Sequence, residues 1–300
     1  MSKNKIKKIL ATVSIYSLLA MTGCGQNATN SPEPTEPPVA TDAPTDTKAP
    51  APTEAATSDN TPAPTSAAVS ESTPVPTETP VPTATIAPEE AWKSNLGTID
   101  LSSLQVSGTG ISVDGSTIYI TSGGDFTVTG TLANGKIIVS TTDRVKLRLS
   151  NASITCKYDS AIFVEKADKT FITMEKGTTN TISSTGTEEA AIYSKDDLEI
   201  KGSGTLTVSS QLSHGIKASD DLNIENGTLI INASKDGIHT NETCDISGGN
   251  ITITASKDGI ESEENLIIRG GSITITARKQ AYTAPGEVTI DESNATIVIQ

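Results

Sequence analysis

Carboxylates recur at one position of a repeating pattern in the C-terminal half of the chain. The position is held in turn by Asp196, Asp220, Glu242 and Glu264, and the next position adds Asp197 and Asp221. If successive repeats stack as paired strands do, about 4.8 Å apart, these like charges face one another. A ladder of this kind is tolerable in water and salt, or when a divalent cation lies among its oxygens. The spacing therefore indicates a candidate cation site.

Two Asp-Gly turns supply a second acidic group. Asp236 and Asp258 each precede a glycine in a repeated Lys-Asp-Gly-Ile tetrad, and Glu261 and Glu263 follow closely. An aspartate before glycine also makes a tight turn by bonding its own backbone. A purely structural role therefore stays open for both aspartates.

The ligand types select the cation. Calcium prefers carboxylate and carbonyl oxygens, whereas a cluster of Cys or His favours zinc. His214 and His239 stand 25 residues apart at different repeat positions, so we expect both at the surface or in turns. Calcium is therefore the predicted cation. Its candidate ligands are Asp196, Asp197, Asp220, Asp221, Asp236, Asp258, Glu261 and Glu263.

A repeat of about 22 residues positions these carboxylates. Overlaid segments align in apolar columns, one of which consists of Leu222, Cys244, Leu266 and Val288. Alternating apolar and polar residues indicate three short strands per repeat, with turns at Asn-Gly and Gly-Gly pairs. One such unit cannot bury its own apolar face and has to stack on its neighbours.

The strand pattern separates the possible solenoids. A leucine-rich repeat needs a Leu-x-x-Leu-x-Leu frame, and hexapeptide helices and nine-residue calcium rolls have shorter periods, but the segments show neither. Three unequal strands per repeat predict an all-β fold, a right-handed parallel β-helix. Looser alternation extends it back to about residue 106, which gives roughly eight or nine coils.

Three further features bear on this β-helix. We expect the polar stretch 175–189 to project from the stack as a loop. Cys156 and Cys244 stand at inward positions several coils apart, which predicts free buried thiols. The apolar strand 295–300 has no polar cap after it, so we expect either that another chain covers this end or that the sequence is truncated.

The first 90 residues do not belong to the β-helix. Lysines precede an apolar stretch from Ile9 to Met21, and Thr22-Gly23-Cys24 follows. This pattern predicts a lipoprotein signal peptide over 1–23 and lipid on Cys24, with an ordinary secretory signal as the alternative. Residues 24–90 hold 14 of the 15 prolines and predict a disordered Pro/Thr-rich linker. The domain 91–300 is thus expected at a bacterial cell surface, anchored to the membrane.

The amino-acid composition excludes some classes of binding partner. The net charge of −14 makes nucleic acid unsuitable, because phosphate binding needs basic stripes that the chain lacks. Phe, Trp and Tyr make up 3% of residues, which argues against a broad aromatic stacking platform. We expect Tyr193 and Tyr282 at inward positions, as core or end-cap residues.

Several motifs occur in a fixed order. The run Gly124–Leu132, the segments Gly135–Val139 and Ser194–Leu198, and the Asp-Gly-Ile turns resemble the family of secreted carbohydrate-binding β-helix lipoproteins, over about residues 92–300. The resemblance implies a fold similar to polysaccharide lyases, bound calcium, and association with cellulose and acidic, pectin-like polysaccharides, without an assigned active site. The family's Asp-Asp and Asp-Gly pattern matches Asp196, Asp197, Asp220, Asp221, Asp236 and Asp258. The sequence departs from it at Glu242-Thr243, Glu264-Asn265, His214 and Gln280.

Three functions follow as hypotheses. In the first, a surface-tethered module binds polysaccharide: calcium bridges acidic turns to uronates, while Thr, Ser and Asn on strand faces bond sugar hydroxyls. In the second, a calcium-dependent polysaccharide lyase uses Arg269, Arg278 or Lys279 as base beside the metal, although these can equally be solvated strand-edge charges. The third is a structural or adhesive solenoid, indifferent to calcium and polysaccharide. We expect the binding module, without enzyme activity.

Overall fold

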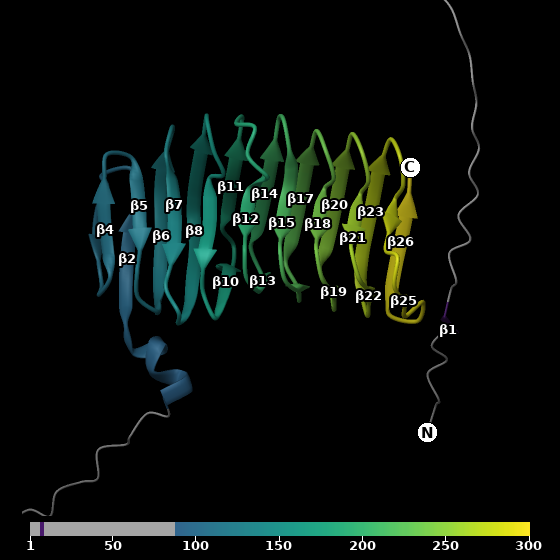
Figure 1. Cartoon of the computed structure of the whole chain (residues 1–300), viewed down its shortest axis with the longest axis horizontal. Coiled ribbons are helices and arrows are strands. Elements are labelled where there is room, and N and C mark those ends of the chain that lie inside the picture. The colour runs from purple at the N-terminus through teal and green to yellow at the C-terminus, as the bar shows by residue number, and fades with distance from the viewer. Residues whose placement is uncertain (1–6, 9–87) are drawn as a thin grey trace, which may run out of the picture. The chain divides into compact units, whose positions relative to one another are not determined.

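A computed structural model describes residues 7–8 and 88–300 of the chain. The predicted signal peptide, Cys24 and the linker lie outside the described residues, apart from β1 (Lys7–Lys8) and residues 88–90. From residue 96 onward the chain forms an all-β solenoid of about eight coils with roughly 23 residues each (Figure 1). The predicted parallel β-helix and its coil number are confirmed.

Each full coil contributes a strand to each of three faces, numbered here in the order in which the chain visits them. Face 1 contains β2 (Leu96–Asp100), β10 (Lys169–Met174), β13 (Leu198–Gly202), β16 (Leu222–Ile224), β19 (Cys244–Ile246), β22 (Leu266–Ile268) and β25 (Val288–Ile290). Face 2 contains β11 (Thr179–Ser184), β14 (Thr205–Ser210), β17 (Thr228–Ala233), β20 (Asn250–Ala255), β23 (Gly271–Ala277) and β26 (Ala295–Ile299). Face 3 contains β4 (Ile111–Asp114), β5 (Thr117–Ile120), β7 (Lys136–Ser140), β9 (Ile162–Lys166), β12 (Ala190–Ser194), β15 (His214–Ala218), β18 (Ile238–Thr240), β21 (Ile260–Ser262) and β24 (Tyr282–Thr283).

Two long strands pass from face 1 into face 2 without a break. β6 (Gly124–Leu132) pairs with β2 and β8, and β8 (Arg144–Cys156) pairs first with β10 and then with β11. Faces 1 and 2 are therefore parts of one sheet of 17 strands, whereas face 3 is a separate sheet of nine strands.

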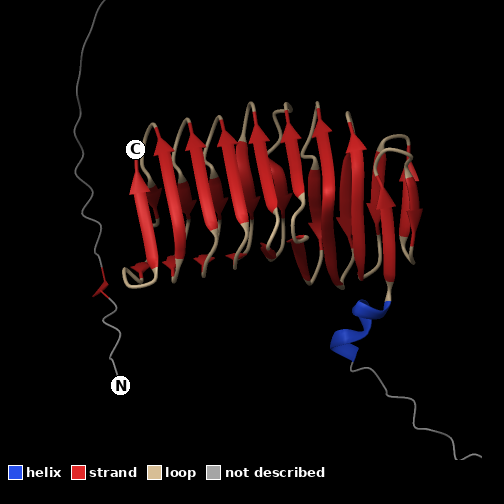
Figure 2. Cartoon of the chain, turned by 180° about the vertical axis from the view of Figure 1, so that it is seen from behind, coloured by secondary structure: helices blue, strands red, loops and turns tan. Residues whose placement is uncertain are grey.

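The core consists of inward residues that stack from coil to coil. Ile231, Ile253 and Ile275 lie opposite one another on β17, β20 and β23, and none of the three is exposed. Burying each such side chain contributes about 1.5–3 kcal/mol. Because alternate residues of a strand point to opposite sides, the same register arrays polar residues on the outer surface. Figure 2 shows the strands of face 2 side by side.

The N-terminal end of the solenoid differs from the regular coils. β3 (Gln105–Ser107) pairs antiparallel with β2, and β4 pairs antiparallel with β5. The 3-10 helix η1 (Pro88–Ser94) places Trp92 on Phe171 of β10, with ring centroids 5.7 Å apart. The two hairpins replace the open parallel edge that the first coil would otherwise present.

The expected loop over residues 175–189 is wrong. Its centre is the regular strand β11, which pairs with β8 on one side and β14 on the other. An inward-facing Asn180 hides the strand pattern in the sequence, since its amide bonds Ala152 N–H (2.9 Å) and Thr205 O (3.1 Å) of the neighbouring coils. The irregular residues are limited to the ends of the stretch, before β11 and between β11 and β12.

Both cysteines of the β-helix are buried and free, as predicted. Cys244 faces the core on β19, and burial raises the pKa of its thiol to about 12. A thiol held neutral in this way packs as a small apolar side chain.

Candidate functional site

The predicted ligands fall into two groups at two corners of the solenoid, where other charged side chains and two histidines lie beside them. The first group lies in the turns from face 3 to face 1, and we call it the acidic ladder. It consists of Asp196, Asp197, Asp220, Asp221, Glu242 and Glu264. The second group lies in the turns from face 2 to face 3 and on the adjoining strands, and we call it the histidine corner. It consists of His214, Asp236, His239, Lys257, Asp258, Glu261 and Glu263.

Part of the acidic ladder ties coils together. Asp197 accepts the backbone N–H of Asp221, and Asp221 Oδ1 accepts that of Thr243 at 3.0 Å. Asp196 Oδ2 accepts the N–H of Ala167 at 2.7 Å. Each of these carboxylates retains a second oxygen that these bonds do not use.

Burial and electrostatic repulsion together raise pKa values in the ladder. Burial, followed by the charges of Asp196, Asp197 and Asp221, raises the pKa of Asp220. The pKa of Glu242 is raised chiefly by Asp220. Burial and then Asp221 also raise the pKa of Asp197, although Lys169 opposes them. A divalent cation would relieve this repulsion, and the carboxylate oxygens match the ligands that calcium prefers.

In the histidine corner the two aspartates of the Asp-Gly turns have cationic partners. Asp236 Oδ1 accepts Asp258 N–H at 2.8 Å, and its Oδ2 lies 3.1 Å from Lys257 Nζ. Asp258 repeats the arrangement with Gln280 N–H (2.9 Å) and Lys279 Nζ (3.2 Å). Both aspartates thus have a structural role, in which they bond the next coil's backbone.

The prediction that the histidines are separate surface or turn residues is wrong. His214 and His239 are 7% and 8% exposed, and their ring centroids are 4.8 Å apart. The strands β15 and β18 pair with an offset of 22 residues, so His239 stands opposite Lys217, three positions beyond His214. The two residues are one coil plus three residues apart, so their rings meet on a diagonal between the start of β15 and the neighbouring strand β18. A comparison of columns misses contacts of this diagonal kind.

The shared neighbour of the two rings is Asp236, which is fully buried. Burial favours its neutral form, but the nearby rings of His214 and His239 and the hydrogen bond from Asp258 N–H together lower its pKa. Burial lowers the pKa of His214, with Asp236 opposing. Burial has the same tendency at His239, but Asp236 and Glu261 outweigh it and raise the pKa of that ring.

Aromatic rings on the outer surface stack on one another. Tyr193 was expected to point inward, but it lies half-buried on the outside of β12, with its ring centroid 5.4 Å from that of Phe163. Lys195 lies 5.3 Å from the centroid of Phe163, and Lys217 lies 5.8 Å from that of Tyr193. Because neighbouring rings and ammonium groups lie against these rings, the pair forms no open sugar platform. Tyr282 is half-buried in the last coil of face 3, opposite Ile260.

Face 2 presents an array of uncharged side chains, all polar except Ile230, which we call the polar face. It consists of the outward residues Thr179, Thr181, Ser183, Thr205, Thr207, Ser209, Thr228, Ile230, Asn232, Asn250, Thr252, Thr254, Ser272, Thr274 and Thr276. Within the described chain no side-chain hydrogen bond engages Thr207, Thr252 or Thr254. A shallow groove of about 310 Å³ lies at the carboxyl ends of its strands, lined by residues that include Ser209, Asn232 and Thr254.

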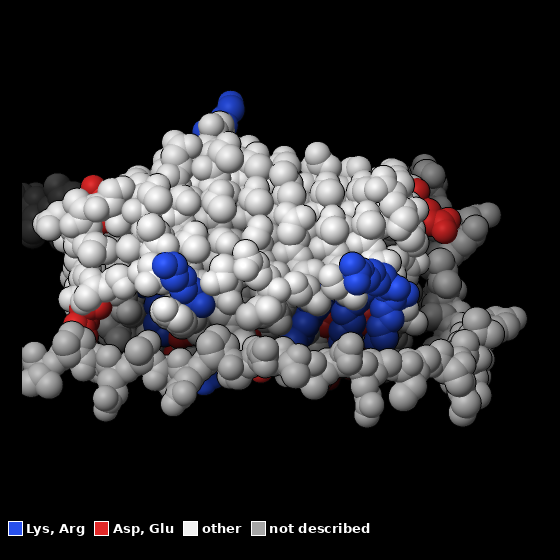
Figure 3. Space-filling model, turned by 90° about the horizontal axis from the view of Figure 1, so that it is seen from above, with Lys and Arg blue, Asp and Glu red and all other residues white. Residues whose placement is uncertain are grey.

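The turns beside this groove carry a row of lysines. Lys235, Lys257 and Lys279 stack through backbone bonds of 3.2 and 3.0 Å from each coil to the one before it. The surface seen in Figure 3 is mostly uncharged, and Lys and Arg appear in a few separate groups, one of them over the C-terminal coils.

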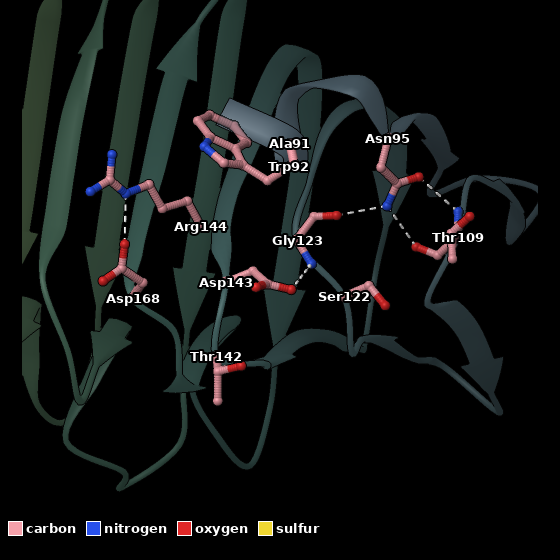
Figure 4. Close-up of a pocket in the computed structure, with 10 residues that line it drawn as sticks. All are labelled: Ala91, Trp92, Asn95, Thr109, Ser122, Gly123, Thr142, Asp143, Arg144 and Asp168. Atoms are coloured by element: carbon pink, nitrogen blue, oxygen red, sulfur yellow. Dashed lines mark hydrogen bonds and ion pairs between the residues drawn. The ribbon is translucent and has the colours of Figure 1, made fainter. Parts of the chain in front are cut away.

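A cleft of about 410 Å³ lies at the N-terminal end, between η1 and the first coils (Figure 4). Asn95 uses its amide there to join Thr109 N–H and the carbonyls of Thr109 and Gly123, at 2.7–2.9 Å. Arg144 bonds Asp168 at 2.6 Å across the cleft's other side. These polar groups chiefly hold the helix and loops in place.

The candidate lyase bases do not lie with the acidic ladder. Arg269 forms a bidentate pair with Asp245 on face 1, which raises the pKa of its guanidinium. Lys279 is paired with Asp258, and Arg278 is exposed at the turn after β23. A general base has to reach its proton in the neutral form, and the pairing of Arg269 works against that form.

Known proteins resemble this solenoid in sequence and structure. A carbohydrate-binding domain-containing protein from Acetivibrio thermocellus is 32% identical over 41% of this chain and 48% of its own length, so the chain spans about half of that curated relative. The solved structure of a polysaccharide lyase-like protein from C. thermocellum, a gadolinium derivative, superimposes with a TM-score of 0.57 and 28% identity, covering 68% of this chain and 94% of that one. The family model of the carbohydrate-binding domain-containing protein matches residues 114–300. The match covers more than half of the chain, which therefore belongs to the carbohydrate-binding domain-containing protein family.

Proposed function

We propose that this chain is a cell-surface lipoprotein, anchored through lipid on Cys24, whose solenoid binds plant-type polysaccharide on the polar face and calcium on the acidic ladder. Family membership supports a carbohydrate-binding role. The observation that carries the choice of surface is the row of unengaged hydroxyl groups on face 2, represented by Thr207, Thr252 and Thr254.

The polar face suits a neutral polysaccharide such as cellulose. Its hydroxyl and amide groups both donate and accept hydrogen bonds, as sugar hydroxyls do. They repeat with the coil spacing of about 4.8 Å on a rigid sheet, so little ordering accompanies binding. None of its residues is charged or aromatic. Hydrogen bonds should therefore be the main source of affinity for the polysaccharide.

Calcium on the acidic ladder suits an acidic, pectin-like polysaccharide. The oxygens that Asp196, Asp197 and Asp221 keep free could coordinate a cation together with Asp220 and a uronate of the ligand. The ladder lies at the turn between faces 3 and 1, whereas the polar face belongs to face 2. We therefore assign neutral and acidic polymers to separate surfaces, with calcium required for the acidic one.

A calcium-dependent polysaccharide lyase remains the alternative that the lyase-like relative suggests. It needs a base beside the cation, and Arg269, Arg278 and Lys279 all lie elsewhere. A structural or adhesive solenoid is the third candidate, for which calcium and polysaccharide should be irrelevant.

A retention experiment with the full chain separates these functions. The protein is mixed with insoluble cellulose or with immobilised polygalacturonate, in calcium or in chelator, and the polygalacturonate supernatant is read for unsaturated product. We expect chelator-insensitive retention on cellulose and calcium-dependent retention on polygalacturonate, without product. Unsaturated product would identify a lyase, and no retention on either polymer would leave the structural solenoid. Acid-polymer retention that survives chelation but fails in high salt would point to the row of Lys235, Lys257 and Lys279 instead.

A further inference from the structure

Three potential ligand atoms converge in the histidine corner, and a fourth, from Glu261, lies beside one of them. His214 Nδ1 lies 3.0 Å from Asp236 Oδ2, and His239 Nδ1 lies 3.7 Å from the same oxygen. His239 Nδ1 is also 3.2 Å from Glu261 Oε2. The ligand atoms of His214, Asp236 and His239 all lie within 4.8 Å of one another.

These separations match those around a small metal ion. Ligand bonds of about 2.0–2.1 Å at tetrahedral angles place the ligand atoms roughly 3.3 Å apart. The distances of 3.0, 3.2 and 3.7 Å lie on either side of this value. Two imidazoles with carboxylates are the ligands of zinc and similar divalent ions, whereas calcium takes oxygen almost alone.

His214 supplies an independent sign of a missing ligand. The residue is 93% buried, and yet its Nδ1 has no hydrogen-bond partner within the described chain. The 3.0 Å contact with Asp236 is short enough for a hydrogen bond but lacks the necessary alignment. A buried polar nitrogen without a partner costs about 1–3 kcal/mol, and a metal ion would satisfy it.

Surrounding groups hold the ligands in place. Asp236 Oδ1 is fixed by Asp258 N–H at 2.8 Å, which leaves Oδ2 to face the rings. His239 Nε2 lies 3.5 Å from Glu263 Oε1, on the far side of the ring from Nδ1. A carboxylate at the second nitrogen is the common partner of a metal-binding histidine, because it orients the ring and increases its basicity.

The ammonium group of Lys257 lies between carboxylates of the histidine corner that would also attract a metal ion. Its Nζ is 2.7 Å from Glu261 Oε2 and 3.1 Å from Asp236 Oδ2, two of the four ligand atoms. The side chain is 38% exposed and attached to a turn, so it can swing outward into solvent. Lys257 would thus neutralise the corner in the absence of metal and compete with an incoming ion.

We propose that His214, Asp236 and His239 form a binding site for a zinc-class divalent transition metal, gated by Lys257, with Glu261 turning in from beside His239 as the fourth ligand. The chain contains two histidines, and both are here. The site is separate from the acidic ladder, and the inference does not depend on the proposed carbohydrate function. Bound metal would join the coils of β15, β18 and β21 at one corner.

The test uses the full chain without an affinity tag, titrated with zinc chloride in excess calcium so that oxygen-only sites are filled. Calorimetry gives affinity and stoichiometry, and the imidazole NMR signals show which residues bind. We expect one zinc ion that shifts both histidine signals. His239→Gln should weaken binding more than 100-fold and Glu263→Gln about 10–100-fold, whereas Lys257→Gln should strengthen it about fivefold.

Asp196→Asn in the acidic ladder is the matched control and should leave zinc affinity unchanged. Circular dichroism establishes that each variant is folded, and Lys257→Gln keeps every ligand in case His239→Gln does not fold. The proposal is overturned if zinc moves neither imidazole signal, if His239→Gln binds as the wild type does, or if Lys257→Gln leaves the affinity unchanged.

Discussion

Two corners of the same solenoid handle stacked acidic residues in opposite ways. At the acidic ladder, Asp196, Asp220 and Glu242 follow one another with like charge, and the pKa values of Asp220 and Glu242 are raised. At the histidine corner, each stacked aspartate has a lysine and a backbone N–H, and the pKa of Asp236 is lowered. The coil geometry is the same at both, so the difference comes from the side chains placed between the carboxylates. One corner pairs its carboxylates with cationic side chains, whereas the other leaves like charges facing one another.

The largest effect is expected from replacing Asp236, the buried carboxylate at the centre of the histidine corner. Asp236→Ala leaves the buried Asp258 N–H without its acceptor and removes one of the two carboxylates that Lys257 contacts, which should cost about 3–5 kcal/mol of unfolding free energy. Urea unfolding followed by circular dichroism measures the loss. Asp236→Asn keeps the Oδ1 acceptor and should lose less. A loss below about 1 kcal/mol for the alanine variant would show that the two corners do not differ as described.

Calcium should stabilise the protein by binding to the acidic ladder. At 100 times its dissociation constant, calcium adds about 2.7 kcal/mol to a site present in the folded state only, which raises the melting midpoint by about 5–10 °C in a domain of this size. The double variant Asp220→Asn with Asp221→Asn should lose most of this gain, as measured by calorimetry with calcium and with chelator. A gain that persists in the double variant would assign the calcium to another place.

Repulsion between stacked carboxylates, as in the acidic ladder, can also be introduced on the polar face by mutation. Thr252 and Thr274 are opposite one another on β20 and β23, so changing both to Asp builds a short ladder in the middle of the proposed cellulose surface. We expect at least about a tenfold loss of cellulose affinity, equivalent to about 1.4 kcal/mol, in binding isotherms on the insoluble polymer. Changing both residues to Ser preserves the hydroxyls and should retain binding. Equal affinity of both variants would exclude this face as the site.

The smallest effect concerns one charge of the ladder. In chelator, Asp220→Asn should stabilise the protein by less than about 1 kcal/mol, because the site is largely solvated. The pKa of Asp220 is raised in the folded state, so its charge disfavours folding once the pH rises through that pKa, and the disadvantage disappears as the pH falls. The gain of the variant should thus shrink on acidification from pH 7, as followed by thermal melts. A gain that grows toward acid would contradict the raised pKa.

The regular columns explain why the fold could be predicted. Leu222, Cys244 and Leu266 repeat at a fixed interval and all face the core, so the sequence period is the coil period. The loop predicted over 175–189 was wrong because of Asn180. In the sequence, a buried amide that bonds neighbouring backbones cannot be told from a loop residue. The contact of His214 and His239 was missed for a different reason, because it runs diagonally from one coil to the next along face 3. Tyr193 was misplaced by one position, which reverses the side of a strand on which a residue lies.

The unbroken strands β6 and β8 have a mechanical consequence. In the function we propose, the chain is anchored at its N-terminus and holds an insoluble polymer, so that it is pulled through its first coils, where these two strands carry the sheet around the corner from face 1 to face 2. Bonds along a long strand pair that is loaded parallel to its length share the force, whereas short strands separated by turns give way one after another. The coils nearest the tether should therefore be the last to yield under load, while the short-stranded coils beyond them can unravel and re-form.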